Sequence, residues 1–202
     1  MSVDPTLVLA LYEEGIAAIE QSVGGWSADR WSRRTCGTWT GIDVAGHLIC
    51  DVGWYHSWLD RAEVGDASIP FAADEIDAHN DAALASLGPS DGHERLEVFA
   101  AEARRYAIRV VGAWDLQYGT PLGTITAGLH AGLAAGEWHL HAWDLSAGAH
   151  RPRDARQLFQ AVGAGMTASW DNPKRWIGNA MLPLAARRRP WEQLINRSGR
   201  RP

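Results

Sequence analysis

The chain has 202 residues, enough for one domain with its own hydrophobic core, and its formal net charge of −5 gives no reason to expect a nucleic-acid partner. No apolar run reaches the roughly 18 residues of a membrane span, and no secretory signal precedes the first amphipathic segment. The cysteines, Cys36 and Cys50, form no C-x-x-C pair, so neither a disulfide framework nor a cysteine-ligated zinc site is expected. We therefore expect a cytoplasmic protein with one domain over residues 1–202.

Apolar residues recur at intervals of three and four along most of the chain, which is the spacing of amphipathic helices. Asp4 followed by Pro5 is typical of a helix start, and Gly24 and Gly25 mark the end of that helix. We predict helices over 5–23, 40–64, 72–87, 91–117, 126–147, 151–170 and 190–197.

The connections between these helices show no convincing strand pattern. Residues 26–39 are polar and interrupted by tryptophans, so we expect irregular structure there, and we expect a loop over 119–126. Four long amphipathic helices predict an all-α protein built as a helix bundle. We expect the bundle core to span about 5–172, with 173–202 as a C-terminal extension that packs on it.

The helix predicted over 126–147 carries three polar groups on one face of an apolar segment. Glu137 and His141 lie one turn apart, because residues four apart stack on a helix, and Asp144 follows three residues later. Carboxylate and imidazole together suit Zn²⁺, and also Fe²⁺, Mn²⁺ or Ni²⁺. We therefore expect Glu137 and His141 to supply two ligands of a divalent metal.

His47, on the helix predicted over 40–64, is the candidate third ligand. Its stripe continues through Asp51, Trp54 and Trp58 at steps of four, three and four. Metal sites in bundles use side chains from facing helices, and a set of two histidines and one glutamate leaves coordination positions open for catalysis. Asp51, one turn after His47, is expected to orient the imidazole.

The residues alone leave a second interpretation open. Glu and His four apart are more often a solvated pair than a metal site, and a buried polar network or a capped helix end would also explain this face. Burying such groups without partners is costly, so either interpretation requires a metal or hydrogen bonds. The remaining histidines have no matching context and are interpreted as surface or packing residues: His56, His79, His93, His130, His139 and His150.

Three segments have recognisable patterns. Residues 39–48, WTGIDVAGHL, resemble W-T-x-x-D-V-A-x-H-L; residues 137–145, EWHLHAWDL, resemble E-x-x-x-H-x-W-D-L; and residues 194–202 resemble the ending L-L-x-x-x-G-R-x-P. In this order they resemble the DinB-like superfamily, in particular its mycothiol-dependent maleylpyruvate isomerase-like branch. The resemblance extends over essentially the whole chain.

This resemblance implies a DinB/YfiT-like four-helix bundle with up-down-down-up connectivity and extra short helices in the connections and at the C-terminus. It places the metal triad on His47, Glu137 and His141, with Zn²⁺ as the first choice and Ni²⁺, Fe²⁺ or Mn²⁺ as alternatives. It assigns a catalytic role to Asp144 and implies mycothiol as a thiol co-substrate. We expect no further C-terminal domain of the kind that contributes an arginine in the isomerase, so Arg197 or Arg200 becomes a candidate replacement.

The expected function is a divalent-metal-dependent, mycothiol-type transferase or isomerase that acts on a small electrophile, with a metal-bound thiolate as nucleophile. The substrate pocket is expected to include Trp54, Trp58, Trp143 and Arg200. A non-catalytic binding module and a metal-assisted hydrolase remain as alternatives. We expect small-molecule and thiol partners, no membrane partner, and a homodimer as one available assembly.

Overall fold

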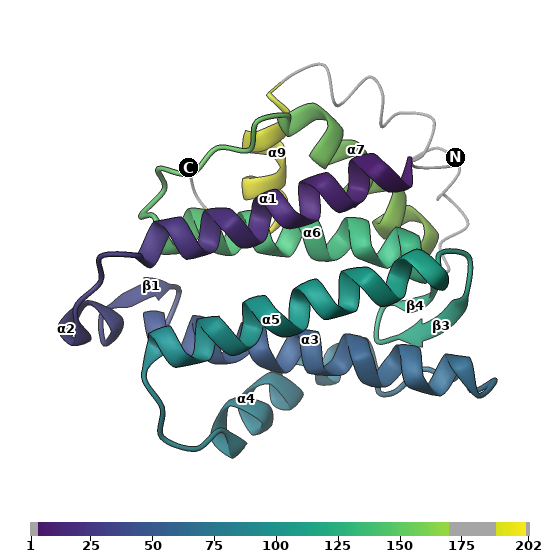
Figure 1. Ribbon diagram of the computed structural model, residues 1–202, viewed down its shortest axis with the longest axis horizontal. Coiled ribbons are helices and arrows are strands. Elements are labelled where there is room, and N and C mark those ends of the chain that lie inside the picture. Colours follow the sequence, from purple (N-terminus) through teal and green to yellow (C-terminus); the bar gives the residue numbers. More distant parts are fainter. Residues whose placement is uncertain (1–3, 170–188, 201–202) are drawn as a thin grey trace.

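The computed structural model describes residues 4–169 and 189–200. Four long helices form a bundle, and shorter helices and two hairpins lie around it (Figure 1). The bundle helices are α1 (Pro5–Val23), α3 (Gly41–Glu63), α5 (Gly92–Gly112) and α6 (Ala127–Leu145). The other elements are α2 (Ala28–Trp31), β1 (Arg34–Cys36), β2 (Trp39–Thr40), η1 (Ala73–Glu75), α4 (Ile76–Ser86), β3 (Gln117–Thr120), β4 (Gly123–Thr126), α7 (Ala155–Ser169) and α9 (Pro190–Arg197).

The bundle consists of two parallel helix pairs that run in opposite directions (Figure 1). α1 packs along α6, where the Leu11 carbonyl lies 3.0 Å from His139 Nε2. α3 packs along α5, where Arg109 forms ion pairs with Asp60 and Glu63. This up-down-down-up arrangement confirms the predicted all-α, DinB-like fold class.

Side-chain caps determine where the helices that carry the predicted site begin. The Thr40 hydroxyl accepts a hydrogen bond from the Asp43 N–H, and the Asp43 carboxylate accepts one from the Thr40 N–H, which completes a capping box. Thr126 caps α6 in the same position by accepting from the Leu129 N–H. These caps fix the first turns of α3 and α6, and therefore the faces on which their later residues lie.

The core between the helices is rich in aromatic side chains. The buried Trp138 ring lies 5.7 Å from the Tyr12 ring and 4.8 Å from the Phe99 ring, both in edge-on contacts of the kind aromatic pairs prefer. α1 approaches α6 closely at Gly15, where an added Cβ would lie 2.7 Å from the Trp138 Cβ. A small residue is therefore required at this crossing.

The predictions for two connections were wrong. Residues 26–39 contain α2 and the short hairpin β1–β2, and residues 119–126 belong to the antiparallel hairpin β3–β4 rather than to a loop. The second hairpin turns at Pro121 and Leu122, and β4 begins at Gly123, whose φ of 116° is available to glycine at low cost. β-Branched residues flank this turn, but the strands span four residues each, too few for an alternating pattern to stand out.

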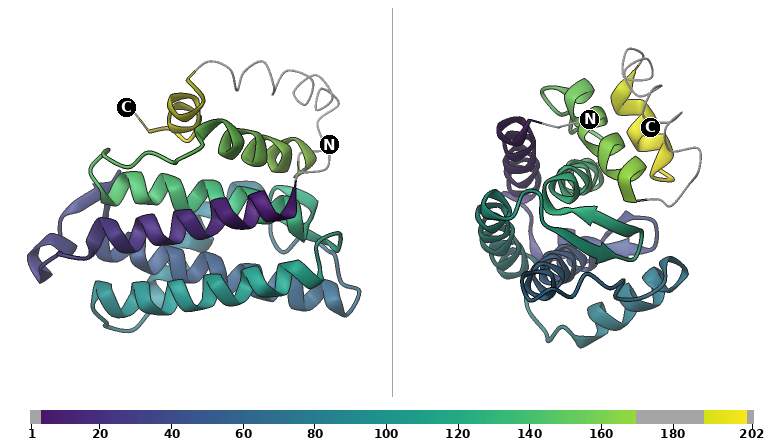
Figure 2. Two further views of the ribbon diagram at one scale, coloured as in Figure 1. Left: turned by 45° about the horizontal axis from the view of Figure 1, so that its top comes forward. Right: turned by 90° about the vertical axis from the view of Figure 1, so that its right-hand side faces the viewer.

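Figure 2 shows α7 and α9 on the side of α6 that faces away from α3 and α5. α7 packs on α6 at its small residues, and α9 packs on α7 through Trp191, Leu194 and Ile195. Most of the predicted extension, namely 173–188 and 201–202, lies outside the described residues. No helix in the described part of the chain is long and apolar enough to cross a membrane.

Candidate metal and substrate site

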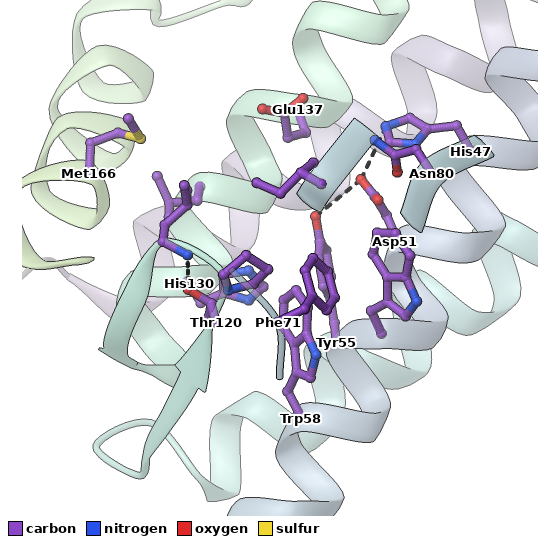
Figure 3. Close-up of a pocket in the computed structure, with 15 residues that line it drawn as sticks. His47, Asp51, Tyr55, Trp58, Phe71, Asn80, Thr120, His130, Glu137 and Met166 are labelled. Carbon is purple, nitrogen blue, oxygen red and sulfur yellow. Dashed lines mark hydrogen bonds and ion pairs between the residues drawn. The ribbon is translucent and has the colours of Figure 1, made fainter. Parts of the chain in front are cut away.

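A cavity of about 280 Å³ lies between α3, α6, α4 and the β3–β4 hairpin (Figure 3). Its walls are mostly aromatic, with Trp54, Tyr55 and Trp58 from α3 and Phe71 from the segment before α4. Figure 3 shows Glu137 and His47 toward one end of the cavity and Trp58 toward the other. A mostly apolar cavity of this size with a few polar groups is typical of a small-molecule site.

The structure brings the three predicted metal ligands together at one end of this cavity. The His47 and His141 rings have centroids 5.2 Å apart, although they lie on different helices. Glu137 Oε2 lies 3.9 Å from His141 Nε2. His47 and Glu137 line the cavity, whereas His141 is buried and does not line it.

The donor set fits a divalent cation. The Nδ1 atom of His47 is buried without a hydrogen-bond partner, which is costly for a polar atom inside a protein. Burial lowers the pKa of His47 to about 4, so this ring is neutral, as a metal ligand must be. The Glu137 side chain is 45% exposed because it faces the cavity, yet burial within the fold raises its pKa, and His141 opposes that rise.

Asp51 lies where a carboxylate that orients His47 would be expected. Its Oδ2 is 3.3 Å from His47 Nε2 and accepts a hydrogen bond of 3.4 Å from the Tyr55 hydroxyl. Burial raises the pKa of Asp51 to about 7, and the nearby His141 acts against this rise. The contact holds the His47 ring in one orientation at the wall of the cavity.

Asp144 lies on the far side of His141 from the cavity. Its Oδ2 is 3.1 Å from His141 Nδ1. Arg200 donates from Nε and Nη2 to the two carboxylate oxygens, at 2.7–3.0 Å. Burial acts to raise the pKa of Asp144, but contacts with His141 and Arg200 outweigh it and lower the pKa overall.

Cys36, His141 and Asp144 also place potential ligand atoms within 4.8 Å of one another. Two observations argue against a metal there. The Arg200 guanidinium, a fixed positive charge, holds both oxygens of Asp144 and lies 3.9 Å from Cys36 Sγ. Burial raises the pKa of Cys36 to about 11, so a metal would have to displace the thiol proton at a cost before Cys36 could bind it. His47, Glu137 and His141, here called the histidine–glutamate set, remain the candidate metal ligands.

The structure divides the predicted pocket residues into two groups. Trp54 and Trp58 line the cavity, whereas Trp143 and Arg200 do not. Trp143 lies against Gly148 beyond the end of α6, and Arg200 is engaged with Asp144. The expectation that Trp143 shapes the pocket therefore does not agree with its position, because it lies beside His141 in sequence but on another side of α6.

Other residues of the site had not been singled out from the sequence. Asn80 from α4 and Thr120 from β3 line the cavity, and His130, interpreted as a surface or packing residue, lines it as well. Asn80 and Thr120 lie in short elements without a distinctive motif. His130 lies seven residues before Glu137 on the same face of α6. Helical periodicity could therefore have indicated that both residues face the same cavity.

The family model described as the Mycothiol maleylpyruvate isomerase N-terminal domain matches residues 12–146. This range covers most of the chain and contains the whole histidine–glutamate set. The chain therefore belongs to the mycothiol maleylpyruvate isomerase N-terminal domain family.

Among solved structures, one described as "Crystal structure of the mycothiol-dependent maleylpyruvate isomerase" is similar to this chain. The TM-score is 0.60 with 16% sequence identity, over 84% of this chain and 70% of that chain. At this level of identity the likeness shows a shared fold. No curated protein sequence matches the chain.

Proposed function

We propose that this protein is a divalent-metal-dependent enzyme that uses a low-molecular-weight thiol of the mycothiol type to isomerise or conjugate a small electrophile. The observation that carries the proposal is the convergence of His47, His141 and Glu137 at one end of the cavity, where the buried Nδ1 atom of His47 lacks a partner. Family membership supports a thiol as the co-substrate.

His47, Glu137 and His141 are proposed to hold the metal, with Zn²⁺ as the first choice because the donors are two imidazoles and one carboxylate. A divalent cation in this position supplies Lewis acidity that lowers the pKa of a thiol and favours its thiolate form. Asp51 keeps the His47 ring in place through its contact of 3.3 Å. Trp54 and Trp58 line the cavity and provide a flat aromatic surface for a planar substrate.

Asp144 is proposed to act through His141. It lies behind that ring at 3.1 Å and is itself held by Arg200, so it fixes the orientation of the imidazole rather than reaching into the cavity. This makes Asp144 a positioning residue and Arg200 its support. The proposal differs from a direct proton-transfer role for Asp144, which would require the carboxylate to face the substrate.

A conjugated cis double bond next to a carbonyl is the electrophile that suits this chemistry. Addition of the thiolate to one carbon of the double bond forms a C–S bond and allows rotation about the former double bond. Elimination of the thiolate then breaks the same C–S bond and restores the double bond as the trans isomer, with no thiol consumed. If elimination does not follow, protonation of the neighbouring carbon gives a conjugate.

The test is turnover of maleylpyruvate, followed by NMR, with purified protein, Zn²⁺ and mycothiol. We expect isomerisation that requires both additions, is abolished in Glu137→Gln, and is unchanged in the control His93→Gln, whose exposed side chain lies on α5 away from the cavity. Absence of thiol-dependent turnover of maleylpyruvate and of other unsaturated acids would overturn the proposal. Turnover that needs metal but no thiol would indicate a hydrolase instead.

A further inference from the structure

His130 is a polar group of the cavity that the proposed chemistry does not use. It lies on α6 seven residues before Glu137, which corresponds to about 10 Å along the helix axis, and it lines the same cavity. Figure 3 shows it beside Thr120, away from the end that holds His47 and Glu137. An elongated small molecule that reaches the metal-ligand end would therefore extend toward His130.

Two buried tyrosines hold the His130 ring from behind. The Tyr118 hydroxyl lies 2.6 Å from His130 Nδ1, and the Tyr106 hydroxyl lies 3.1 Å from the same atom. The two hydroxyls are 2.6 Å apart. Both tyrosine side chains are fully buried, and burial raises their pKa values above the ordinary value, so each hydroxyl keeps its proton and must donate it.

This network fixes the tautomer of His130. If Nδ1 carried the proton, it would donate to one hydroxyl, and the two tyrosines would then have two protons but only one remaining acceptor between them. If Nδ1 is unprotonated, Tyr106 donates to Tyr118, Tyr118 donates to Nδ1, and every donor is satisfied. The ring therefore carries its proton on Nε2.

The Nε2 atom is available to a ligand. No described residue hydrogen-bonds to it, and it is not among the buried polar atoms that lack a partner, so it is accessible from the cavity. The ring is held edge-on against Tyr55 at 4.4 Å and Trp58 at 5.7 Å, which limits its rotation. Burial lowers the pKa of His130 to about 3, so the ring remains neutral.

We propose that His130 is a substrate-binding residue whose Nε2–H donates a hydrogen bond to a carboxylate or carbonyl oxygen of a small unsaturated acid in the cavity. Tyr118, whose hydroxyl donates to Nδ1, is its positioning residue. The reacting end of the acid lies toward His47 and Glu137, and its acceptor oxygen lies toward His130. This orientation rests on the proposed function. The aromatic walls between the two ends suit a planar, conjugated chain.

The first experiment determines the tautomer by ¹⁵N–¹H NMR correlation on protein labelled at histidine, with the His130 signal assigned from its absence in His130→Gln. We expect protonated Nε2 and unprotonated Nδ1 in the wild type. Tyr106→Phe is the matched control, because Tyr118 still donates to Nδ1, and it should keep this pattern. The double variant Tyr106→Phe/Tyr118→Phe leaves Nδ1 without a hydroxyl partner, so a fraction of the His130 rings should carry the proton on Nδ1 instead. A proton on Nδ1 in the wild type would overturn the proposal.

The second experiment titrates maleate, a small planar unsaturated diacid, into the zinc-loaded protein and its variants. Loss of one hydrogen bond to a charged group should weaken binding about tenfold in His130→Leu. His130→Gln retains an N–H donor near the Nε2 position and should recover much of that loss. Tyr106→Phe should bind as the wild type does, whereas the double tyrosine variant should resemble His130→Leu.

Equal maleate affinity in the wild type, His130→Leu and His130→Gln would overturn the proposal. Zinc content and circular dichroism of each variant identify any that fail to fold, and the tautomer pattern of the folded Tyr106→Phe variant then remains as the test. Failure of the proposed function has a different signature. In that case no variant shows thiol-dependent turnover, although maleate still shifts the His130 Nε2 signal and binds in a His130-dependent way.

Discussion

Each histidine of the proposed metal set has a carboxylate close to its ring. Asp51 lies 3.3 Å from His47, and Asp144 lies 3.1 Å from His141. Histidines that bind metals commonly have such a carboxylate behind them, which fixes the ring orientation and raises its basicity. At the residue scale, the proposed site therefore consists of the three metal ligands and of two carboxylates that orient the histidine ligands.

The pairing of Asp144 with Arg200 can be tested through stability. Removing one partner of a buried ion pair leaves an uncompensated charge, so Asp144→Ala should lower the free energy of unfolding by about 3 kcal/mol in urea denaturation. The matched control is Glu13→Ala, which breaks an ion pair with Arg104 whose side chains are 53% and 40% exposed. There the loss should stay below about 1 kcal/mol. Equal losses in both variants would contradict the assigned burial and pairing of Asp144.

Spacing in the sequence identifies the residues on one helix face but not their partners from elsewhere in the chain. Glu137 and His141 could be recognised as neighbours because helical geometry alone places them together. The contact of Arg200 with Asp144 spans 56 positions in the sequence, and that of Tyr118 with His130 crosses from a hairpin to a helix. No local pattern specifies such contacts, because they depend on how complete elements pack.

At the scale of elements, helices with clear start residues and apolar periodicity could be predicted from the sequence, whereas short strands could not. α1 and α9 span the predicted residues because proline or a capping residue marks their starts and apolar periodicity continues to their ends. The hairpins were missed, and α5 ends at Gly112, several residues before the predicted end. Short strands depend on pairing with each other and on packing against the bundle, neither of which a local window contains.

The close approach of α1 and α6 can be tested with a pair of glycine substitutions. Gly15→Ala places a Cβ within 2.7 Å of Trp138, so the helices must separate, and we expect a loss of about 1–3 kcal/mol in unfolding free energy. Gly53→Ala is the control, since it is an exposed position in α3 with nothing within 4 Å of the added Cβ. It should gain up to about 1 kcal/mol from helix propensity. A neutral or stabilising Gly15→Ala would contradict this packing.

At the scale of the whole molecule, the fold buries several histidines in neutral form. Burial lowers the pKa of His130 to about 3 and that of His139 and His150 to about 4. An unfolded chain binds protons at these rings as the pH falls below about 6.5, whereas the folded chain does not until near pH 4. These groups therefore make the protein less stable as the pH falls through that range. Asp51, with its pKa raised to about 7, acts in the opposite direction and offsets part of the effect.

The contribution of one such ring can be isolated at His139, which is buried between α1 and α6 and also lies 2.8 Å from His150. Urea denaturation at pH 6.5 and pH 4.5 should show a smaller decline in unfolding free energy for His139→Gln than for the wild type, by about 2 kcal/mol. The control His93→Gln, at an exposed position, should show the wild-type decline. The same decline in all three proteins would contradict burial of a neutral His139.

The up-down-down-up bundle brings α3 and α6 together so that His47 meets Glu137 and His141, and this convergence is the central claim. The most direct test is metal content by mass spectrometry, on protein purified without chelator and supplied with Zn²⁺. We expect about one zinc ion per chain in the wild type and in His93→Ala, and near-complete loss in His47→Ala and Glu137→Gln. No zinc in the wild type, or the same zinc content in all four proteins, would contradict the account.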